Sequence, residues 1–473
     1  MSKFQNNSIA TSNVACLFEP DSVAIIGTLN ESFFGGYVVV NQLQKFGYTG
    51  KIYPINPKCT SILGLMAYPT LDAVPGTIDL AVIMTSYRSF PKIIEDCANK
   101  GVKAAIIVSD GFAEKDEKGA LLQQEIIDIA NRANMRLIGP NTIGLTNTAN
   151  GLMPNPYALE YDKIHPGAIA IYGQTGLVGP QALPLEDMHY GISKICDVGN
   201  KCDVDESDFL EYLKNDPSTE VVAMHIEDVK DGRRFIDKAR EVVAIKPVLA
   251  LKPGREKESA KAMASHTGSM AGDDKIYDAA FKQSGIIRVD SHVELLEYAK
   301  MFTCNRTLPT GNRVAIISFT GGFGVMGVDA AINAGLSLAE YTPQTKEKLY
   351  NIFPNLVNNP TDLGPAFPVV QDFDGLYTGV LDAAINDDNV DCIAIVTFIG
   401  LGMKSLHIFS DILEKTSKPM ALWVYSQQLP VKAEFISDLE KIGFPVYSKW
   451  EHALGALGAI YKYSTIKTKF NSN

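Results

Sequence analysis

The feature that most constrains this chain is a rhythm repeated in three successive blocks: a short apolar run, a glycine-rich or polar turn, and an amphipathic helical stretch. Short apolar runs between helical stretches are typical of strands buried in parallel sheets. The strands expected are 22–28, 51–56, 80–85, 104–109 and 136–139, then 168–173, 193–198, 221–227, 248–252 and 286–289, then 313–320, 336–341, 393–399, 420–425 and 445–448. Right-handed crossovers between such strands give doubly wound sheets, which bind ligands at the carboxyl ends of their strands. The sequence therefore predicts an α/β fold.

The length of 473 residues is too great for one hydrophobic core, so several domains are expected. A segment rich in Pro, Asn and Gly at 149–166 separates the first two blocks, and a second joint falls at 305–312. We therefore expect three consecutive doubly wound domains, at residues 14–148, 149–305 and 306–465.

Composition excludes several classes of protein. No apolar run reaches the ~18 residues of a membrane helix, and residues 1–13 lack the apolar core of a signal peptide. The net charge is −11, without a basic run, which argues against a nucleic-acid partner. Seven cysteines without a C-x-x-C pair indicate free thiols and no metal site. We expect a soluble, cytoplasmic protein that contacts neither nucleic acid nor membrane.

The first block begins with an apolar run, 23–27, that leads straight into a loop of small and polar residues and then a helix. This is the layout of a nucleotide-binding first turn. The dinucleotide pattern G-x-G-x-x-G is absent, which disfavours a nicotinamide cofactor and leaves a nucleotide or coenzyme A open. Lys58 follows the second strand, where it could face a phosphate or be a solvated surface lysine.

The second block repeats this layout at Gly173-Gln174-Thr175-Gly176-Leu177. Its N–H groups could form an anion seat at a helix N-terminus, or the segment could be an ordinary glycine-rich turn. Glu227 ends the strand expected at 221–227, so it falls on the ligand edge of the same sheet. The acidic run 203–208 precedes an apolar helix, and most of its members are expected to cap that helix.

A single imidazole, His266, lies among small residues in the octet 265–272. Small residues let backbone N–H groups approach an anion, and a neutral imidazole can carry a phosphoryl group as a covalent intermediate. If the Glu227 carboxylate held one nitrogen of His266, the other would be free to attack. The alternative for His266 is an exposed histidine in a surface turn, and the alternative for Glu227 is an acid in a surface loop. In the third block, the turn 318–325 and the loop 358–364 suggest no chemistry, and no P-loop pattern occurs in the chain.

Taken in order, these segments resemble the NDP-forming acyl-CoA synthetases, which include the ADP-forming acetyl-CoA synthetases and, more distantly, the α subunit of succinyl-CoA synthetase. The resemblance extends over about 14–463. Its most specific parts are the His266 loop and the run Gly199–Glu206. The segments that carry it are Gly139-Pro140-Asn141, Gly173-Gln174-Thr175-Gly176, Gly199-Asn200-Lys201, Glu227, Lys252-Pro253-Gly254-Arg255 and Ser265-His266-Thr267-Gly268.

The resemblance implies a Rossmann-like CoA-binding domain followed by two flavodoxin-like, succinyl-CoA synthetase-like domains. It implies that His266 is phosphorylated during turnover and that Glu227 orients it. The phosphate-binding residues it implies are Gly173, Gln174, Thr175, Gly176, Leu177 and Gly268. The CoA-binding residues it implies are Gly27, Thr28, Gly36, Lys58, Ser109, Asp110 and Asn141.

The activity implied is that of the α subunit of an ADP-forming acid–CoA ligase. Such an enzyme reversibly converts acyl-CoA, ADP and phosphate to carboxylic acid, CoA and ATP through an acyl phosphate and a phosphohistidine. Nothing in the chain resembles the family's ATP-grasp module, so a separate β subunit is expected, in a heterotetramer, with magnesium bound beside the nucleotide on that partner. The alternatives are a CoA-binding regulatory protein without turnover and a citryl-CoA-type ligase or lyase on the same domains.

Three positions depart from the family pattern. The first loop, 29–34, has no basic residue where relatives usually carry them. Thr142 stands where a cysteine is frequent, and Phe323 where proline or alanine is frequent. The first departure bears on how the phosphates of CoA are bound.

Overall fold

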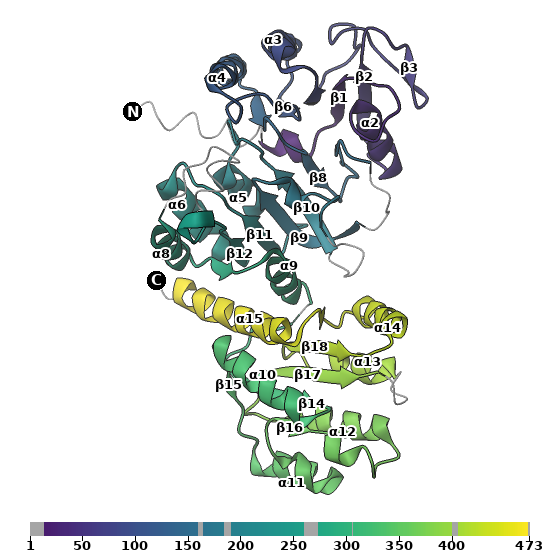
Figure 1. The fold of residues 1–473 in the computed structure, drawn as a ribbon, viewed down its shortest axis with the longest axis vertical. Coiled ribbons are helices and arrows are strands. Elements are labelled where there is room, and N and C mark those ends of the chain that lie inside the picture. Colours follow the sequence, from purple (N-terminus) through teal and green to yellow (C-terminus); the bar gives the residue numbers. More distant parts are fainter. Residues whose placement is uncertain are drawn as a thin grey trace. The chain divides into compact units, whose positions relative to one another are not determined.

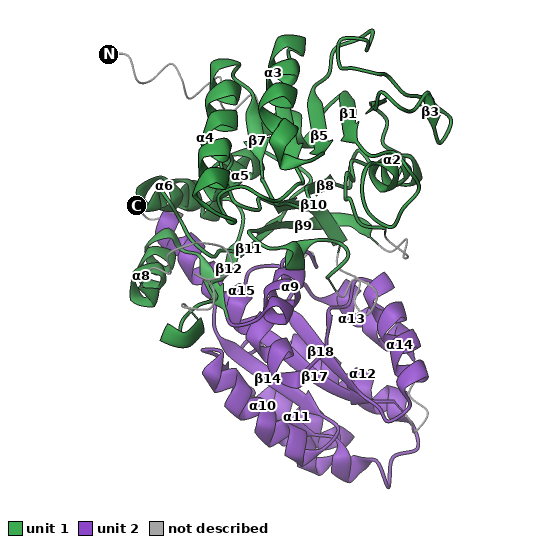
Figure 2. Cartoon of the chain, turned by 45° about the horizontal axis from the view of Figure 1, so that its top comes forward, with its two compact units in different colours: residues 1–186, 190–289 green, residues 187–189, 290–473 purple. Residues whose placement is uncertain are grey.

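The computed structural model describes residues 14–158, 164–183, 191–259, 273–304, 306–399 and 405–471. Three mainly parallel sheets follow one another along this part of the chain (Figure 1). The chain divides into two compact units (Figure 2), the first comprising 1–186 and 190–289 and the second 187–189 and 290–473. The first two sheets lie in the first unit and the third sheet in the second. No helix within the described ranges is long and apolar enough to cross a membrane.

The first sheet has the order β2-β1-β5-β6-β7, with every pairing parallel. Alternate residues of these strands, such as Ala24 and Ile26, share one buried core with α3 and α4. The residues between them, such as Ile25, are buried as well, which explains why the apolar runs are continuous. The elements are β1 (Ser22–Gly27), α2 (Gly36–Lys45), β2 (Lys51–Ile55), β3 (Ser61–Ile62), β4 (Leu65–Met66), β5 (Leu80–Met84), η1 (Tyr87–Ser89), α3 (Phe90–Lys100), β6 (Ala104–Ile107), α4 (Glu117–Arg132) and β7 (Arg136–Ile138).

The second sheet has the order β13-β12-β11-β9-β10-β8. Its edge strand β8 runs antiparallel to β10, whereas the other pairings are parallel. The elements are β8 (Leu145–Asn147), β9 (His165–Gly173), η2 (Gly176–Val178), β10 (Gly191–Asp197), α5 (Glu206–Lys214), β11 (Val221–His225), α6 (Gly232–Val243), β12 (Val248–Leu251), α8 (Asp274–Ser284) and β13 (Ile287–Val289).

The third sheet has the order β15-β14-β17-β18-β19, and β16 pairs with β14. One face packs against α10 and α15, and the other against α11 to α14. The elements are α9 (His292–Met301), β14 (Arg313–Ser318), α10 (Gly321–Asn333), β15 (Ser337–Leu338), α11 (Pro343–Ile352), η3 (Pro354–Val357), β16 (Thr361–Asp362), η4 (Gly364–Ala366), α12 (Phe373–Ile385), β17 (Cys392–Phe398), α13 (Leu406–Lys415), β18 (Met420–Tyr425), α14 (Leu429–Lys441), β19 (Val446–Tyr447) and α15 (Trp450–Asn471).

Every predicted strand is present, and the α/β, doubly wound prediction is confirmed. With the predicted strands of each sheet numbered along the chain, all three sheets have the order 2-1-3-4-5, as in flavodoxin-like folds. The antiparallel strand β8 was not predicted. Its three residues pair with a strand more than forty residues further on, so no local pattern marks them. The domain boundaries at 148/149 and 305/306 stay a prediction.

A short backbone run, 199–204, joins the two sheets of the first unit; we call it the 199–204 seam. Its N–H groups donate to carbonyls at the end of β7 and in the loop that follows: Asn200 to Pro140 (2.9 Å), Cys202 to Gly139 (3.0 Å) and Val204 to Leu137 (3.1 Å). The seam begins at Gly199, which has φ of +52° and lies so close to the Pro140 carbonyl that a Cβ would meet its oxygen at 2.2 Å. Glycine is therefore required where the seam starts.

Candidate active site

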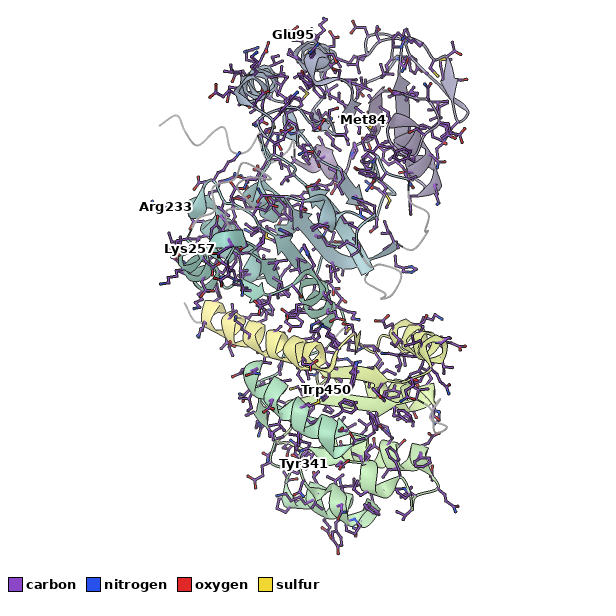
Figure 3. All side chains as sticks on the ribbon, in the orientation of Figure 1. Met84, Glu95, Arg233, Lys257, Tyr341 and Trp450 are labelled. Atoms are coloured by element: carbon purple, nitrogen blue, oxygen red, sulfur yellow. The ribbon has the colours of Figure 1, made fainter. Side chains whose placement is uncertain are left out.

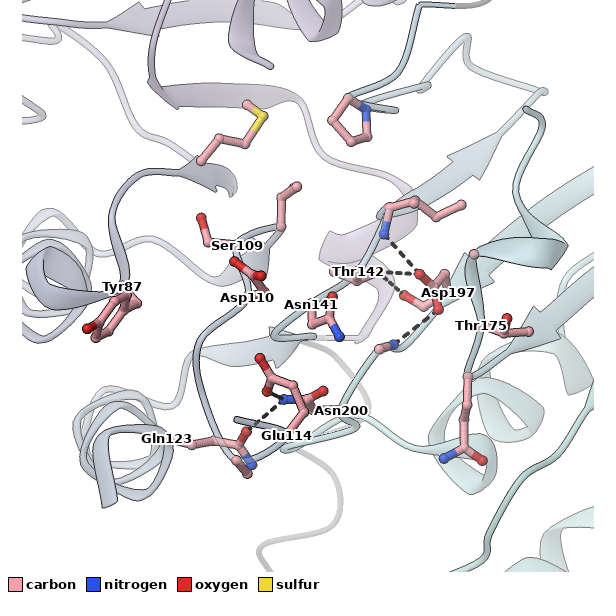
Figure 4. Close-up of a pocket in the computed structure, with 18 of the residues that line it drawn as sticks. Tyr87, Ser109, Asp110, Glu114, Gln123, Asn141, Thr142, Thr175, Asp197 and Asn200 are labelled. Carbon is pink, nitrogen blue, oxygen red and sulfur yellow. Dashed lines mark hydrogen bonds between the residues drawn. The ribbon is translucent and has the colours of Figure 1, made fainter. Parts of the chain in front are cut away.

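A cavity of about 1000 Å³ lies within the first unit, at the carboxyl edges of its two sheets (Figure 4). The loops that line it follow β1, β5, β6, β7, β9, β10 and β11. Both doubly wound sheets therefore contribute to one site, at the edge where such sheets bind ligands.

The structure brings most of the candidates from the first block together. Thr28, Gly36, Ser109, Asp110 and Asn141 all line the cavity. The Asn141 backbone is left-handed, with φ of +58°, and its N–H donates to the Ser109 carbonyl at 2.9 Å. The loops after β6 and β7 are thus held to each other.

Two further candidates from the first block do not line the cavity. Gly27 ends β1, and its carbonyl accepts a 2.7 Å hydrogen bond from the Asn56 amide, which ties the first loop to the second strand. Lys58 is exposed, and its backbone N–H closes a turn onto the Asn56 side chain at 2.8 Å. The surface alternative for Lys58 is the one that its position favours.

The glycine turn of the second block contributes Gln174, Thr175 and Gly176 to the cavity, but not Gly173 or Leu177. Thr175 caps η2 by accepting the Leu177 N–H at 3.3 Å. Among the described residues, the helix expected after this turn is the three-residue η2, so its dipole is small, and anion binding by this turn stays a prediction.

Glu227 lines the cavity two residues beyond β11, and it is only 8% exposed. The Gln174 side-chain oxygen accepts the backbone N–H groups of Glu227 (3.0 Å) and Asp228 (3.1 Å), and its amide donates to the Asp228 carboxylate at 2.6 Å. Gln174 therefore fixes the 173–177 turn and the Glu227 backbone relative to each other.

Asp197, at the end of β10, is a buried cavity carboxylate that sequence reasoning missed. It accepts the N–H groups of Ile143 (2.9 Å) and Gly199 (3.1 Å) and the Thr142 hydroxyl (3.1 Å). Burial raises the pKa of its carboxyl to about 6 against these hydrogen bonds, and the charge of Glu227 adds to the rise. The rule that singled out Glu227, an acid at the carboxyl end of a strand, applies equally to Asp197.

The run Gly199–Glu206 is explained by burial and ion pairing. Lys201 is 2% exposed, and its ammonium lies 3.0 Å from each of the Glu206 and Asp228 carboxylates. Burial opposes ionisation of Asp228, but the charge of Lys201 and the Gln174 hydrogen bond hold its pKa below the usual value. Lys201 thus supports the residue next to Glu227.

The capping prediction for the acidic run is confirmed at α5, where Asp205 and Asp208 form a capping box. Asp203 and Asp208 also each lie 2.9 Å from the Arg136 guanidinium on β7, a pairing that was not predicted. These acids therefore strengthen the 199–204 seam as well as the helix.

His266 and Gly268 lie outside the described residues, as does the whole stretch 260–272. The described residues that lead to this stretch follow β12, which pairs in parallel with β11. The histidine loop and Glu227 thus follow neighbouring strands, and the orientation of the imidazole by Glu227 stays a prediction.

The third sheet carries rings at the edge where the second sheet has a cavity. Phe319, Phe323, Phe398, Trp423 and Tyr425 form what we call the aromatic cluster. Their nearest centroids are 5.1 to 5.9 Å apart. Trp450, the first residue of α15 (Figure 3), donates its indole N–H to the Phe323 carbonyl at 3.0 Å. Phe323, the unusual residue of this turn, is therefore part of the packing.

Comparisons with known proteins agree with this architecture. A family model described as "CoA binding domain" matches residues 21–148, and one described as "Succinyl-CoA ligase like flavodoxin domain" matches 166–302. The solved structure of the dinucleotide-forming acetyl-coenzyme A synthetase 1 of Ca. Korarchaeum cryptofilum, in complex with phosphate and ADP, superposes with a TM-score of 0.87. It is 29% identical and covers 97% of this chain and 98% of that chain.

Two curated relatives are similar over nearly the whole chain. The α subunit of ADP-forming acetate–CoA ligase I from Pyrococcus furiosus is 34% identical, over 97% of this chain and 99% of its own length. ADP-forming acetate–CoA ligase II from Archaeoglobus fulgidus is 37% identical over 95% of this chain, which spans only 66% of that longer relative. This chain belongs to the family of ADP-forming acetate–CoA ligases.

Proposed function

We propose that this chain is the α subunit of an NDP-forming acyl-CoA synthetase, which reversibly converts acyl-CoA, ADP and phosphate to a carboxylic acid, CoA and ATP. One observation carries the proposal: loops of the CoA-binding domain line the same cavity as Gln174–Gly176 and Glu227 of the flavodoxin-like domain. A thioester and a phosphate can meet in such a cavity, and holding two reactants together accelerates their reaction.

In the proposed sequence, phosphate attacks the thioester carbonyl and the C–S bond breaks. CoA leaves as its thiol, carrying the proton from phosphate, and an acyl phosphate forms. An imidazole nitrogen of His266 then attacks phosphorus, the P–O bond to the acyl group breaks, and the carboxylate leaves. Phospho-His266 finally passes its phosphoryl group to ADP, which regenerates the imidazole.

Glu227 is proposed to accept the N–H of the second imidazole nitrogen of His266. This contact selects the tautomer whose other nitrogen attacks, and it stabilises the positive charge that develops as the N–P bond forms. The fixed backbone of Glu227 supports this role, because Gln174 binds it and also borders the phosphate seat. The seat itself is proposed to comprise Gly173–Leu177 and Gly268. Of these, Gln174, Thr175 and Gly176 line the cavity, and Gly268 lies outside the described residues.

A nucleotide-binding partner is part of the proposal. The Pyrococcus relative, whose length this chain matches almost completely, is named as a subunit alpha, and the Archaeoglobus relative is longer. An ATP-grasp β subunit in a heterotetramer is proposed to carry the nucleotide and its magnesium. We place the assembly in the cytoplasm, which is supported by seven cysteines that form no disulfide.

The deciding experiment is to map a covalent phosphoryl group. The purified chain is incubated with acyl-CoA and labelled phosphate, and acid-labile label is located by peptide mapping in wild type and in His266→Asn. We expect label on His266 alone and none in the variant. Label elsewhere, or equal label in the variant, would overturn the mechanism. CoA binding without any label would favour the regulatory alternative.

A further inference from the structure

The charge of the cavity wall poses a problem for CoA. Among the described lining residues, acidic side chains outnumber the single cation, Lys230. The Lys230 ammonium donates to the Lys201 carbonyl at 2.6 Å, so part of its hydrogen-bonding capacity is used. CoA carries a pyrophosphate and a 3′-phosphate, whose negative charges cationic side chains would stabilise. The acids are Asp110, Glu114, Asp197, Glu227 and Asp228.

The positions that sequence reasoning offered do not supply these cations. The loop 29–34, which follows β1, contains no basic residue. Lys58 does not line the cavity, and neither does Asn56, onto which its backbone turns. Other basic side chains near the described cavity wall are therefore candidates for the phosphates of CoA.

Two exposed cations that do not themselves line the cavity flank a tyrosine of its wall. Tyr87, in η1, lines the cavity. The Arg88 side chain donates to the Tyr87 hydroxyl at 3.3 Å, and the Lys115 ammonium lies 4.6 Å from the centre of its ring. The Arg88 hydrogen bond, the charge of Arg88 and then that of Lys115 lower the pKa of Tyr87. In the described part of the chain neither cation forms an ion pair with a carboxylate, so their charge is not neutralised locally.

The place of this cluster in the fold is where a ligand is expected. In the order β2-β1-β5, β2 is added on one side of β1 and β5 on the other, so the strand order switches direction between β1 and β5. Doubly wound sheets bind ligands at such a switch point. Tyr87 follows β5 directly. In Figure 4, Tyr87 lies on the opposite side of the cavity from Thr175 and Asp197, with Asn141 between them. One end of the cavity thus has Tyr87, with two exposed cations beside it and Asp110 and Glu114 nearby in the lining, and the other end has Thr175 and Asp197.

We propose that Arg88, Lys115 and the Tyr87 hydroxyl bind the phosphates at the nucleotide end of CoA, in place of the basic residues that the first loop lacks. The proposal rests on the proposed function. Arginine offers a planar fork of donors that matches a phosphate, and lysine adds a point charge. With the nucleotide held there, the pantetheine arm leads past Asn141 and the thioester reaches Glu227.

The test is the dissociation constant for CoA, measured by calorimetry on the purified chain. We expect Arg88→Ala and Lys115→Ala each to weaken binding by roughly tenfold, an exposed charged contact being worth less than a buried one. Arg88→Ala/Lys115→Ala should weaken it further and flatten its dependence on salt. Tyr87→Phe should cause a smaller loss. Lys118→Ala is the matched control, because it removes an exposed charge from the same region without touching Tyr87.

A second ligand, 3′-dephospho-CoA, shows which phosphate group of CoA the two cations bind. If the cations bind the 3′-phosphate, the double variant should bind CoA and 3′-dephospho-CoA equally weakly. If they bind the pyrophosphate, it should lose the same factor for both ligands. CoA affinity in the double variant equal to that of Lys118→Ala would overturn this proposal and leave the proposed function standing. A wild-type chain that binds no CoA would overturn both.

Discussion

The second and third sheets have the same strand order and begin their first crossover with similar turns, yet their carboxyl edges differ. Thr175 and Thr320 both follow the first strand and cap the next element. Beyond them, the second sheet opens on a cavity that contains Asp197 and Glu227. The third sheet presents the aromatic cluster instead. Topology provides the edge, and the side chains placed there determine whether it binds a ligand or packs as core.

The largest effect on activity is expected at the carboxyl edge of the second sheet, which we call the polar edge. Glu227→Gln keeps the size of the side chain but removes the charge proposed to orient His266, so phosphorylation should slow by roughly 10² to 10⁴. Rapid-quench measurement of the labelled chain checks the rate. The matched control is Glu220→Gln, at the other end of the same strand, where the side chain is exposed. Equal rates in both variants would remove Glu227 from the mechanism.

Substitutions at the carboxyl edge of the third sheet, which we call the aromatic edge, should change stability rather than ligand binding. Phe319 is 8% exposed and packs on three other rings, so Phe319→Ala should cost about 3 to 5 kcal/mol of unfolding free energy. The chain has only two tryptophans, Trp423 and Trp450, and both lie in the second unit. Urea unfolding followed by tryptophan fluorescence therefore reports on this edge.

Two controls sharpen that measurement. Phe319→Leu keeps most of the apolar volume and should lose much less stability. CoA affinity, which reports on the first unit, should not change in either variant. A loss of CoA binding in Phe319→Ala with normal tryptophan unfolding would mean that the aromatic edge takes part in ligand binding after all.

A smaller effect is expected on the pH dependence of stability, which should differ between the polar and aromatic edges. Because burial raises the pKa of Asp197 from 3.8 to about 6, the folded state binds this proton more tightly than the unfolded state. The stability that this proton contributes is complete below about pH 4 and is lost as pH rises to about 6, which amounts to about 3 kcal/mol. Asp197→Asn should lack this loss.

The measurement is far-UV circular dichroism of urea unfolding between pH 4 and 7. The advantage of wild type over Asp197→Asn should shrink across that range. Tryptophan fluorescence, which follows the third sheet, should show no difference between the two proteins. A constant difference by circular dichroism would show that Asp197 is already ionised at pH 4.

The smallest effect on stability is expected from alanine substitutions of one glycine after the first strand of the second sheet and one after the first strand of the third sheet. A Cβ at Gly322 would meet no atom within 4 Å, so Gly322→Ala in α10 should be neutral or stabilising by at most about 1 kcal/mol. A Cβ at Gly176 would also fit, its nearest neighbours being 3.8 and 3.9 Å away, but Gly176 lines the cavity. Gly176→Ala should therefore keep its melting temperature and slow His266 labelling. Equal labelling in both variants would contradict the phosphate seat.

The strands could be predicted because each is a local apolar run buried on both faces, as the fully buried residues of β5 and β6 show. Their ends were less certain, since where a strand stops depends on pairing with neighbours. The strands β8 and β16 have three and two residues, so only their distant partners define them. The polar edge was predictable in outline, because strand order places the carboxyl ends together.

Contacts between distant segments could not be predicted. Arg136 reads as an ordinary surface residue at the start of a strand, and nothing near it in sequence indicates that Asp203 and Asp208 bind it. Lys58 reads as a candidate phosphate ligand, but the turn onto Asn56 leaves it outside the cavity. Arg88 and Lys115 lie far apart in the chain, and only folding brings both to Tyr87.

The 199–204 seam has a consequence for how the first unit opens. Its backbone hydrogen bonds continue the edge of the first sheet with residues of the second domain, so the two walls of the cavity cannot separate without breaking them. Regions joined by such bonds tend to unfold together as one cooperative unit. The amide protons of Asn200, Cys202 and Val204 should therefore exchange with solvent only when β7 does. Any separation of the two halves of the cavity should therefore appear as exchange of these amide protons together with those of β7.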